Sequence, residues 1–281
     1  MTSDGFAYAF TVFTPTFNRA RTLPRVYASL KAQTFTDFEW VVVDDGSLDN
    51  TGQLVAAWQD EAAFAIVYER QRNQGKHVAF NRGVALARGR FFLPLDSDDA
   101  CLPHALARLN EVWESIPLAQ RHRFAAVTAL CQDEEGNLLG PRLPGPVMDS
   151  DAIAIKRRWR NTSEKWGFHL TEVLRRFPYP EMEGATFMPE DLVWTAVARQ
   201  YKTRFIDEPL RVYHRGADQL TGSRLSRGQV PGLALWHQAV LEREIGYFWS
   251  APLDFLRSAV NYARFSFLEG RDVGAHPVDA E

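Results

Sequence analysis

The chain has few cysteines, little charge imbalance and no long apolar run, and each absence argues against a class of protein. Its 281 residues include two cysteines, Cys101 and Cys131, too few for a disulfide framework and without the spacing of a metal site. Lys and Arg number 32 against 35 Asp and Glu, and the net charge of −3 gives no support to nucleic-acid binding. No apolar stretch approaches the ~20 residues that cross a bilayer.

From the opening residues we do not expect a signal peptide. Its opening residues, MTSDGFAYAF, have neither the basic start nor the apolar core of a signal peptide. Together with the low cysteine content, this predicts a cytoplasmic protein. The furthest departure we expect from a soluble state is peripheral contact with the inner face of the membrane.

What the sequence does have is a regular alternation in its first half. Hydrophobic residues make up 46% and aromatic residues 12% of the chain, which is typical of a packed domain. Short apolar segments rich in β-formers alternate with segments of helical period. The expected strands are Ala7–Thr14 (ended by Pro15), Glu39–Val43, Ala65–Glu69, Phe91–Leu95 and Phe124–Leu130, and the expected helices are Leu23–Gln33, Thr51–Trp58, Val78–Ala87 and Pro103–Ser115. Strands separated by such helices indicate parallel βαβ units in a doubly wound sheet.

After about Gly136 the alternation becomes irregular. The later expected elements are a helix at Leu192–Gln200, a short strand at Arg204–Ile206, and helices near Leu233–Ile245 and Asp254–Glu269. The sequence therefore predicts a nucleotide-binding sheet over about the first 130 residues and a less regular half that completes the site.

Three carboxylates follow the expected strand Phe91–Leu95 within four positions. Asp96, Asp98 and Asp99 repel one another unless something positive neutralises them. A divalent cation carrying phosphate fits, because hard metals take oxygen ligands and share them with substrate phosphates. Acids at the carboxyl end of a strand also lie where ligands bind in open α/β sheets. The alternative is a polar turn in which an Asp caps the next helix.

Two further polar turns follow earlier strands. Thr14–Arg19 (TPTFNR) follows the first strand, and Asp44–Thr51 (DDGSLDNT) follows the second. Each alone has the composition of an ordinary turn. Because the carboxyl ends of parallel strands meet at one sheet edge, we expect these turns and the three acids to converge there.

With these segments the chain resembles a family 2 glycosyltransferase of the inverting GT-A type. The matching segments are Phe13–Thr51, Asn73–Asp99 and Pro189–Arg199. The resemblance implies an α/β protein with one Rossmann-like, mostly parallel sheet flanked by helices, then a less regular acceptor half and C-terminal helices. It implies residues 1–130 as the nucleotide-sugar-binding core, 131–230 as the acceptor-binding and catalytic-base part of the same domain, and 231–281 as a C-terminal helical extension.

The resemblance also implies roles for residues at the strand ends. The residues expected to bind the donor are Pro15, Phe17, Arg19, Asp44, Asp45, Lys76, Arg82, Asp96 and Ser97. A Mg²⁺ or Mn²⁺ ion is expected on the diphosphate, with Asp96, Asp98 and His214 as ligands, where it offsets charge on the leaving nucleoside diphosphate. Phe80 stands where the family usually has Arg, so one family contact has no counterpart here.

A second acidic motif supplies the expected catalytic residues. Glu190 and Asp191 match the family's ED motif, whose Asp serves as general base in inverting transfer. The base need only accept the proton of an acceptor hydroxyl as it attacks the anomeric carbon, without a covalent enzyme intermediate. The alternative is an acid that caps the helix Leu192–Gln200. Pro189 replaces the glycine that usually precedes this motif.

The implied reaction leaves several partners open. The donor is a UDP-sugar by preference, with GDP- and dTDP-sugars also open, and the acceptor is a glycan, a lipid-linked or another hydroxyl, as in polysaccharide biosynthesis. An inactive nucleotide-sugar-binding relative stays open, and so does a sugar-nucleotidyltransferase, although Thr14–Arg19 has no glycine. A phospho-receiver domain fits less well, because its acid pair follows the first strand rather than the second.

Two later segments also have open interpretations. Lys156–Trp166 is rich in cationic and aromatic residues, which fits either an acceptor surface or a solvated helix. Asp254–Glu269 is amphipathic, and its apolar face fits core packing, a homodimer or contact with a membrane surface.

Overall fold

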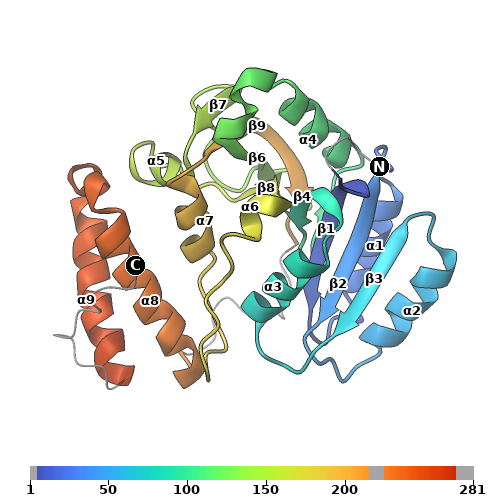
Figure 1. Cartoon of the computed structure of the whole chain (residues 1–281), viewed down its shortest axis with the longest axis horizontal. Coiled ribbons are helices and arrows are strands. Elements are labelled where there is room, and N and C mark those ends of the chain that lie inside the picture. Colours follow the sequence, from blue (N-terminus) through green and yellow to red (C-terminus); the bar gives the residue numbers. More distant parts are fainter. Residues whose placement is uncertain (1–4, 215–224, 270–281) are drawn as a thin grey trace.

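The computed structural model describes residues 5–214 and 225–269. In these residues nine strands form one sheet in the order β3-β2-β1-β4-β8-β6-β9-β5, with β7 paired to β9 (Figure 1). The strands are β1 (Tyr8–Thr16), β2 (Phe38–Asp44), β3 (Ala65–Arg70), β4 (Gly89–Pro94), β5 (Ala100–Cys101), β6 (Phe124–Gln132), β7 (Val147–Ser150), β8 (Lys165–Leu170) and β9 (Lys202–Val212). The α/β class and the single sheet flanked by helices, both predicted from the sequence, are confirmed.

The first half of the sheet is parallel, as the alternation predicted. β1 pairs in parallel with both β2 and β4, and β2 pairs in parallel with β3. The connecting helices are α1 (Leu23–Lys31), α2 (Thr51–Glu61) and α3 (Lys76–Leu86). Every residue of β2 is buried, so helices and loops cover both faces of the sheet there.

The first strand is longer than predicted. Pro15 was expected to end it, but β1 continues to Thr16 and Pro15 pairs with Val43 of β2. The pairing of β1 with β4 ends at Phe13, so Pro15 lies where β1 has one neighbour instead of two. Proline is tolerated in that position because the ladder on one side has already stopped.

The second half of the sheet is mixed, which the sequence did not predict. β8 lies between β4 and β6 and is antiparallel to both, while β6 and β9 are parallel. β8 includes the end of the cationic and aromatic stretch, where no strand was expected, although its burial alternates residue by residue as a strand's does. β9 extends well beyond the three residues expected, since it pairs with β5, β6 and β7 along its length.

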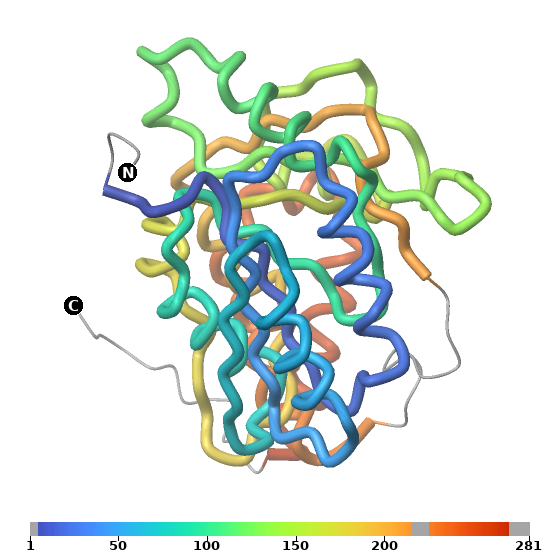
Figure 2. The backbone as a smooth tube through the Cα atoms, turned by 90° about the vertical axis from the view of Figure 1, so that its right-hand side faces the viewer, coloured from blue at the N-terminus to red at the C-terminus, as the bar shows by residue number. Residues whose placement is uncertain are grey.

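The remaining helices cover the second half and the C-terminal end. They are α4 (Ala105–Glu114), α5 (Ala152–Arg157), α6 (Thr171–Leu174), α7 (Asp191–Ala198), α8 (Val230–Arg243) and α9 (Pro252–Glu269), with short 3-10 turns η1 (Leu118–Arg123), η2 (Arg227–Gln229) and η3 (Ile245–Ser250). Figures 1 and 2 show α8 and α9 side by side at the end of the molecule opposite β3 and α2. Among the described residues, every helix is too short or too polar to cross a membrane.

Candidate active site

The three polar turns meet at one edge of the sheet, as predicted. Thr16 pairs with Asp44 at the carboxyl ends of β1 and β2, and Leu95, just after β4, donates its N–H to the Phe13 carbonyl at 2.8 Å. The residues that follow these strands, Phe17, Asp45 and Asp96, therefore leave the same edge. Residues far apart in sequence share this position because the sheet is parallel there.

The first two turns are fastened to each other by side chains. The Asn18 N–H donates to Ser47 Oγ and the Leu48 N–H donates to Asn18 Oδ1, both at 2.8 Å. The Arg19 N–H donates to Thr51 Oγ1 at 3.1 Å. Phe17 takes no part in these bonds, and its side chain is 43% exposed. An exposed aromatic ring on a fastened turn is a surface on which a planar ligand can stack.

The two acids of the second turn accept hydrogen bonds from neutral donors. Asp44 accepts from the Ser47 N–H at 2.7 Å and from the Tyr68 hydroxyl at 2.5 Å. Burial and this bond raise the pKa of Tyr68 well above its usual value. Asp44, predicted to bind the donor, therefore shapes its own turn.

Asp45 holds the loop that leads into α3. Its Oδ1 accepts from Gln71 Nε2 and the Gln74 N–H, and its Oδ2 accepts from the Gly75 N–H, all at 2.8 Å. Gly75 has φ +95°, and a Cβ there would lie 2.6 Å from the Thr186 carbonyl oxygen, so the backbone needs glycine at this point. This structural task of Asp45 was not predicted, because its partners lie in a loop that follows the next strand.

A network of alternating charges joins the end of β4 to the start of α7. Lys76 Nζ lies 2.8 Å from Asp96 Oδ1 and 2.8 Å from Glu190 Oε1, so it bridges two predicted site acids. On the other side of Asp96, Arg211 of β9 donates to Asp96 Oδ2 at 2.8 Å and, through Nε, to Asp99 Oδ2 at 2.7 Å. The network brings together side chains more than a hundred residues apart.

The network shifts the pKa values of its members in opposite directions. Burial opposes ionisation of Asp96, but Lys76 and Arg211 outweigh it and hold the pKa of Asp96 well below its usual range. The ammonium of Lys76 loses part of its hydration within the network, which opposes its charge, but Asp96 and Glu190 outweigh this loss and raise its pKa. Asp99 is almost fully buried, and burial raises the pKa of its carboxyl although Arg211 acts against it. Lys76, Asp96 and Arg211 are therefore all charged at neutral pH.

Two of the predicted metal ligands have side-chain atoms that bind no other described residue. The Asp98 carboxylate has no hydrogen bond or ion pair to another described residue, and the buried His214 Nδ1 has no partner among them. Ala100 pairs with Val212, so Asp98 and His214 each lie two residues beyond that pair, at the ends of β5 and β9. His214 Nε2 faces Glu134 Oε1 at 3.3 Å.

The donor set suits a divalent cation that shares its shell with phosphate. Within residues 5–214 and 225–269, three or more His, Cys, Asp or Glu side chains nowhere group in a way that could hold a metal by themselves. One or two protein ligands suffice where phosphates supply the other oxygens. The site has five carboxylates (Asp96, Asp98, Asp99, Glu190 and Asp191) against three cations (Lys76, Lys156 and Arg211), which leaves two negative charges unbalanced. A divalent cation would balance them.

The ED motif is arranged for more than capping a helix. Glu190 occupies the N-cap position of α7, yet its side chain makes no capping bond and binds Lys76 instead. Asp191 is the first residue of α7, and its Oδ2 forms a short ion pair with Lys156 of α5. Asp191 Oδ1 has no partner among the described residues. Helix capping therefore does not account for either side chain.

Three residues that the sequence analysis considered for the site take no part in the charge network. Arg82 is exposed on α3 and binds Glu69 of β3 at 2.6 Å. Ser97 is buried next to Asp96 and Asp98. Phe80, where the family usually has Arg, packs edge-on against Phe13 and Phe92 in the core. The position of the missing arginine is therefore part of the hydrophobic core.

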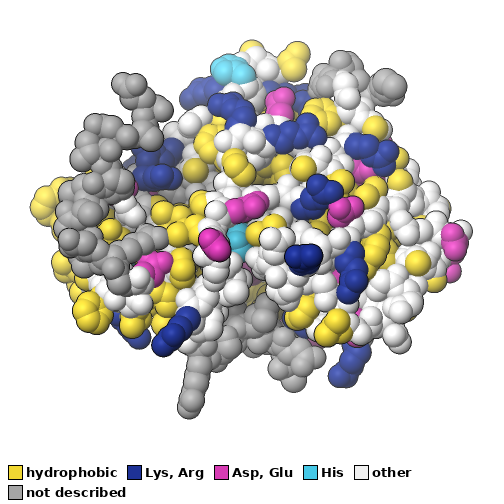
Figure 3. All heavy atoms as spheres, turned by 60° about the horizontal axis from the view of Figure 1, so that its bottom comes forward, with side chains coloured by type: hydrophobic (Ala, Val, Ile, Leu, Met, Phe, Trp, Pro, Cys, Tyr) yellow, Lys and Arg dark blue, Asp and Glu magenta, His cyan; other side chains and the backbone are white. Residues whose placement is uncertain are grey.

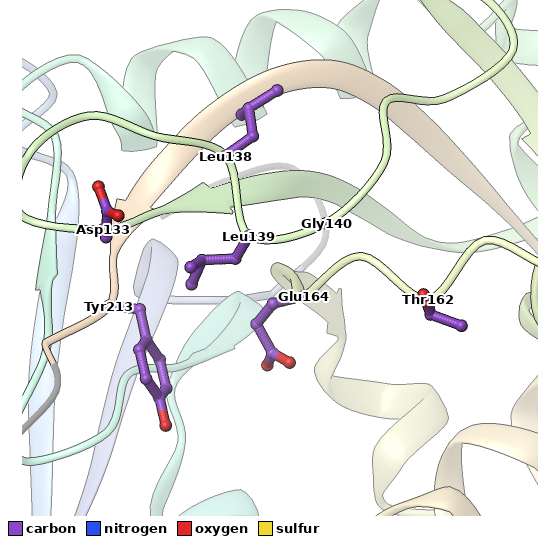
Figure 4. A pocket seen from close by; sticks show the side chains of 7 residues that line it. All are labelled: Asp133, Leu138, Leu139, Gly140, Thr162, Glu164 and Tyr213. Atoms are coloured by element: carbon purple, nitrogen blue, oxygen red, sulfur yellow. The ribbon is translucent and has the colours of Figure 1, made fainter.

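A cavity of about 420 Å³ lies beside the network in the second half of the fold. It is lined by Asp133, Leu138, Leu139, Gly140, Thr162, Glu164 and Tyr213. Figure 4 shows the Glu164 carboxylate and the Tyr213 ring extending to the same side of the loop that carries Leu139. Burial raises the pKa of Glu164. Arg211 acts to lower this pKa, and the negative charges of Glu190 and Asp96 act to raise it. The cavity adjoins the charged network, because the Arg211 guanidinium lies 5.6 Å from the centroid of the Tyr213 ring that lines the cavity.

Three side chains of this region were not among the predicted site residues, although Lys156 belongs to the stretch considered as an acceptor surface and Arg211 to the stretch around His214. Arg211 and Lys156 neutralise the predicted acids, and Glu164 faces the adjoining cavity. An isolated Arg or Glu in a weakly patterned segment carries no local signal. The sequence nevertheless indicated that such cations must exist, because the clustered acids of the site require positive side chains from elsewhere in the chain.

Comparisons with known proteins show the family of this chain. The model of glycosyl transferase family 2 matches residues 11–128. An uncharacterized glycosyltransferase of Nostoc sp. is 42% identical, over 90% of this chain and 80% of that protein. This relative, matched over most of both chains, makes the chain a member of a glycosyltransferase family. The chain belongs to glycosyltransferase family 2.

Solved structures show the same fold. S. aureus TarS 1–349 in complex with UDP-GlcNAc has a TM-score of 0.60 and 20% identity, over 92% of this chain and 72% of that chain. GalNAc-T7 with UDP, GalNAc and Mn²⁺ has a TM-score of 0.60 and 14% identity, over 92% of this chain and 56% of that chain. Identities this low show the fold alone, and the fold is the predicted GT-A type.

Proposed function

We propose that this protein is an inverting, metal-dependent glycosyltransferase that moves a sugar from a UDP-sugar to an acceptor hydroxyl. The observation that carries the proposal is the charge network from Asp99 through Arg211, Asp96 and Lys76 to Glu190. The network joins the edge where nucleotides bind in α/β sheets to the start of α7, where Asp191 lies. Donor and base sites are thereby adjacent.

The nucleoside is proposed to bind between the first two turns. The Phe17 ring is exposed there, with Pro15 and Arg19 beside it in the chain. Asp45 Oδ1 accepts two hydrogen bonds and Oδ2 accepts one, so Oδ2 keeps a lone pair for the N–H of a uracil or guanine ring. The structures of TarS with UDP-GlcNAc and of GalNAc-T7 with UDP favour uracil.

The diphosphate is proposed to lie against Lys76 and the metal ligands. Asp98 and His214 fit the metal because they keep unpartnered ligand atoms, whereas Asp96 is already bound by Lys76 and Arg211. A Mg²⁺ or Mn²⁺ ion bound there would neutralise charge on the departing diphosphate as a Lewis acid. The Mn²⁺ in GalNAc-T7 supports this choice.

Asp191 is proposed to accept the acceptor's proton. As the acceptor oxygen bonds to the anomeric carbon, the bond from that carbon to the diphosphate oxygen breaks, and the diphosphate leaves with its electron pair. The hydroxyl proton passes to Asp191 Oδ1, the oxygen that Lys156 leaves free. The ion pair with Lys156 fixes the orientation of this carboxylate.

The acceptor is proposed to enter through the cavity beside the network. Glu164, Thr162 and Tyr213 present a carboxylate and hydroxyl groups there, which suit the hydroxyls of a glycan. The Glu164 carboxylate has no hydrogen bond or ion pair with another described residue, so it is available to accept from such a hydroxyl. A carboxylate lining disfavours a phosphate group in the cavity itself.

Calorimetry with UDP, GDP and dTDP, each with and without Mn²⁺, tests the donor site. We expect UDP to bind more tightly with Mn²⁺, and Asp98→Asn to abolish the effect of the metal. The matched control is Asp207→Asn, which breaks an ion pair with Arg142 outside the site. Failure of all three nucleotides to bind would remove the proposal.

Turnover measurements distinguish an active transferase from an inactive relative and from a nucleotidyltransferase. Release of UDP from a UDP-sugar in the presence of acceptor supports the transferase. Binding without release identifies an inactive relative. Formation of pyrophosphate from UTP and a sugar phosphate identifies a nucleotidyltransferase.

A further inference from the structure

The C-terminal helical segment carries an unusual concentration of exposed hydrophobic side chains. Of the fourteen large hydrophobic side chains exposed among the described residues, seven lie between Ile245 and Leu268. Trp249 is 89% exposed, and Phe267 is 80% exposed. Isolated exposed hydrophobic residues are ordinary, but a concentration of this kind marks an interaction surface. Figure 3 shows hydrophobic side chains at its left edge, where α9 lies.

The exposed residues of α9 form one stripe. Leu253, Leu256, Val260 and Phe267 follow one another at intervals of three, four and seven residues, which places them on one helix face. The opposite face is buried at Phe255 and Phe265, and Phe265 packs with Val230 and Ala234 of α8. The core therefore takes one face of α9 and leaves the other to solvent. Packing within the core does not explain the stripe.

Arginines accompany the stripe along its length. Arg257 and Arg264 are exposed on the same side of α9 as Val260. The nearest acid on the helix, Asp254, is bound by Arg157 at 2.9 Å, so its charge is already compensated. The exposed face thus combines apolar residues with positive charge.

The surface continues into the cationic and aromatic stretch near α5. Arg160 Nη2 donates to the Ser250 carbonyl at 3.4 Å, which places it beside the exposed Trp249 of η3. Trp159 is exposed next to it, and the Arg158 guanidinium lies 5.9 Å from the Trp159 ring centroid. Exposed tryptophans and arginines are the side chains that anchor proteins at the headgroup level of a membrane.

We propose that this surface docks on an anionic membrane surface, with α9 lying in the plane of the interface. The C-terminal docking surface is defined by Arg158, Trp159, Arg160, Trp249, Leu253, Leu256, Arg257, Val260, Arg264 and Phe267. An in-plane amphipathic helix buries its apolar face at the acyl boundary while its arginines meet acidic headgroups. Because none of its helices is able to span the membrane, the described part of the chain would bind in this way and not by insertion.

Charge complementarity selects a membrane over a second copy of the chain. A two-fold dimer through this stripe would bring Arg257 and Arg264 of both copies into one interface. Among the described residues of α9, both acids, Asp254 and Glu269, lie outside the stripe. Anionic lipid supplies the missing counter-charge, and a second copy does not.

The docking surface is rigidly joined to the candidate active site. Arg157 of α5 is buried and binds Glu244, just after α8, and Asp254 of α9, each at 2.9 Å, which fixes α5 to the segments on both sides of η3. The preceding residue, Lys156, pairs with Asp191. A membrane bound to this surface would therefore hold the region around Asp191 at a fixed orientation. Docking itself does not depend on the proposed chemistry.

Sedimentation of the full chain with lipid vesicles tests the proposal. We expect binding to vesicles of phosphatidylglycerol and phosphatidylcholine, at least tenfold weaker binding to phosphatidylcholine alone, and weakening by salt. Val260→Asp with Phe267→Asp should reduce binding at least tenfold by removing apolar contact. Arg257→Gln with Arg264→Gln should lose the preference for anionic lipid.

Matched changes on η1 serve as controls. Leu118→Asp with Arg123→Gln alters an exposed leucine and an exposed arginine away from the surface and should leave vesicle binding unchanged. Unchanged thermal unfolding of every variant shows that folding is intact, since all of the altered side chains are exposed. Equal binding by wild type and the Val260/Phe267 variant would overturn the proposal. So would a stable dimer, measured by light scattering, that the same variant dissociates.

Discussion

The two pairs of neighbouring acids in the site are held in different ways. Asp44 and Asp45 accept hydrogen bonds from neutral groups, most of them in the loops that the acids themselves organise. Asp96 and Asp99 are held by the charged side chains of Lys76 and Arg211. The first pair therefore shapes a binding surface, whereas the second is the centre of an electrostatic network.

The difference indicates that the first acid pair serves ligand recognition and that the second serves the binding and departure of a charged group. A buried carboxylate held by neutral donors stays able to recognise a neutral ligand N–H, which suits the nucleobase. Carboxylates balanced by fixed cations, with charge left over for a metal, suit the diphosphate and its departure. Four changes test this division, beginning with the largest expected effect.

Asp191→Asn should lower kcat about 10²- to 10⁴-fold, because a carboxamide cannot accept the hydroxyl proton. The affinity for UDP should not change, because Asp191 lies at the acceptor end of the network. Single-turnover kinetics and calorimetry measure the two effects. The control, Asp149→Asn, removes an acid bound by Arg204 away from the site and should leave kcat unchanged. Turnover at the wild-type rate by Asp191→Asn would exclude Asp191 as the base.

Arg211→Met should lower the free energy of unfolding by about 3–5 kcal/mol, because Asp96 and the buried Asp99 lose their shared cation. Arg82→Met removes an exposed pair with Glu69 and should change stability by less than about 1 kcal/mol. Urea unfolding of both variants provides the measurement. Equal losses would show that the network of the second acid pair is not a stabilising unit.

Gly75→Ala should weaken both stability and UDP binding, because a methyl group would collide with the Thr186 carbonyl and displace the loop that Asp45 holds. Gly136→Ala is the matched control, since Gly136 also has positive φ (+84°) but open space around its Cβ position. The control should cost about 1–2 kcal/mol of backbone strain and leave UDP binding intact. If the two variants behaved alike, the collision at Gly75 would be without effect.

Glu164→Gln should produce the smallest change, confined to the pH dependence of stability. Burial raises the pKa of folded Glu164, so above the ordinary Glu value of about 4.3 the folded protein retains a proton that the unfolded chain has lost. Stability should therefore fall as pH rises through that window, and Glu164→Gln should remove this decline. Urea unfolding across pH measures it, with the exposed Glu111→Gln as control. If stability still declined with rising pH in Glu164→Gln, another titrating group would be responsible for the decline.

The parallel half of the fold could be predicted because its signals are local. Each of the first four strands is a short apolar run, and the acids at their ends follow from strand polarity and the single sheet edge. The antiparallel part of the second half could not, because β8 is a strand made by pairing with β4 and β6, and its sequence is charged as well as apolar. Whether this segment forms a strand depends on neighbouring strands that are distant in the chain.

For the site, the acids follow from short sequence motifs, whereas their partners depend on the tertiary structure. Asp45, Asp96, Asp98, Glu190 and Asp191 could be selected from motifs, since each motif is a contiguous run. Which cation meets which acid depends on folding, because Lys76 and Glu190 are 114 residues apart and Arg211 and Asp96 are 115 apart. The amphipathic period of α9 was also legible in the sequence, but only packing against α8 decided which face stays in solvent.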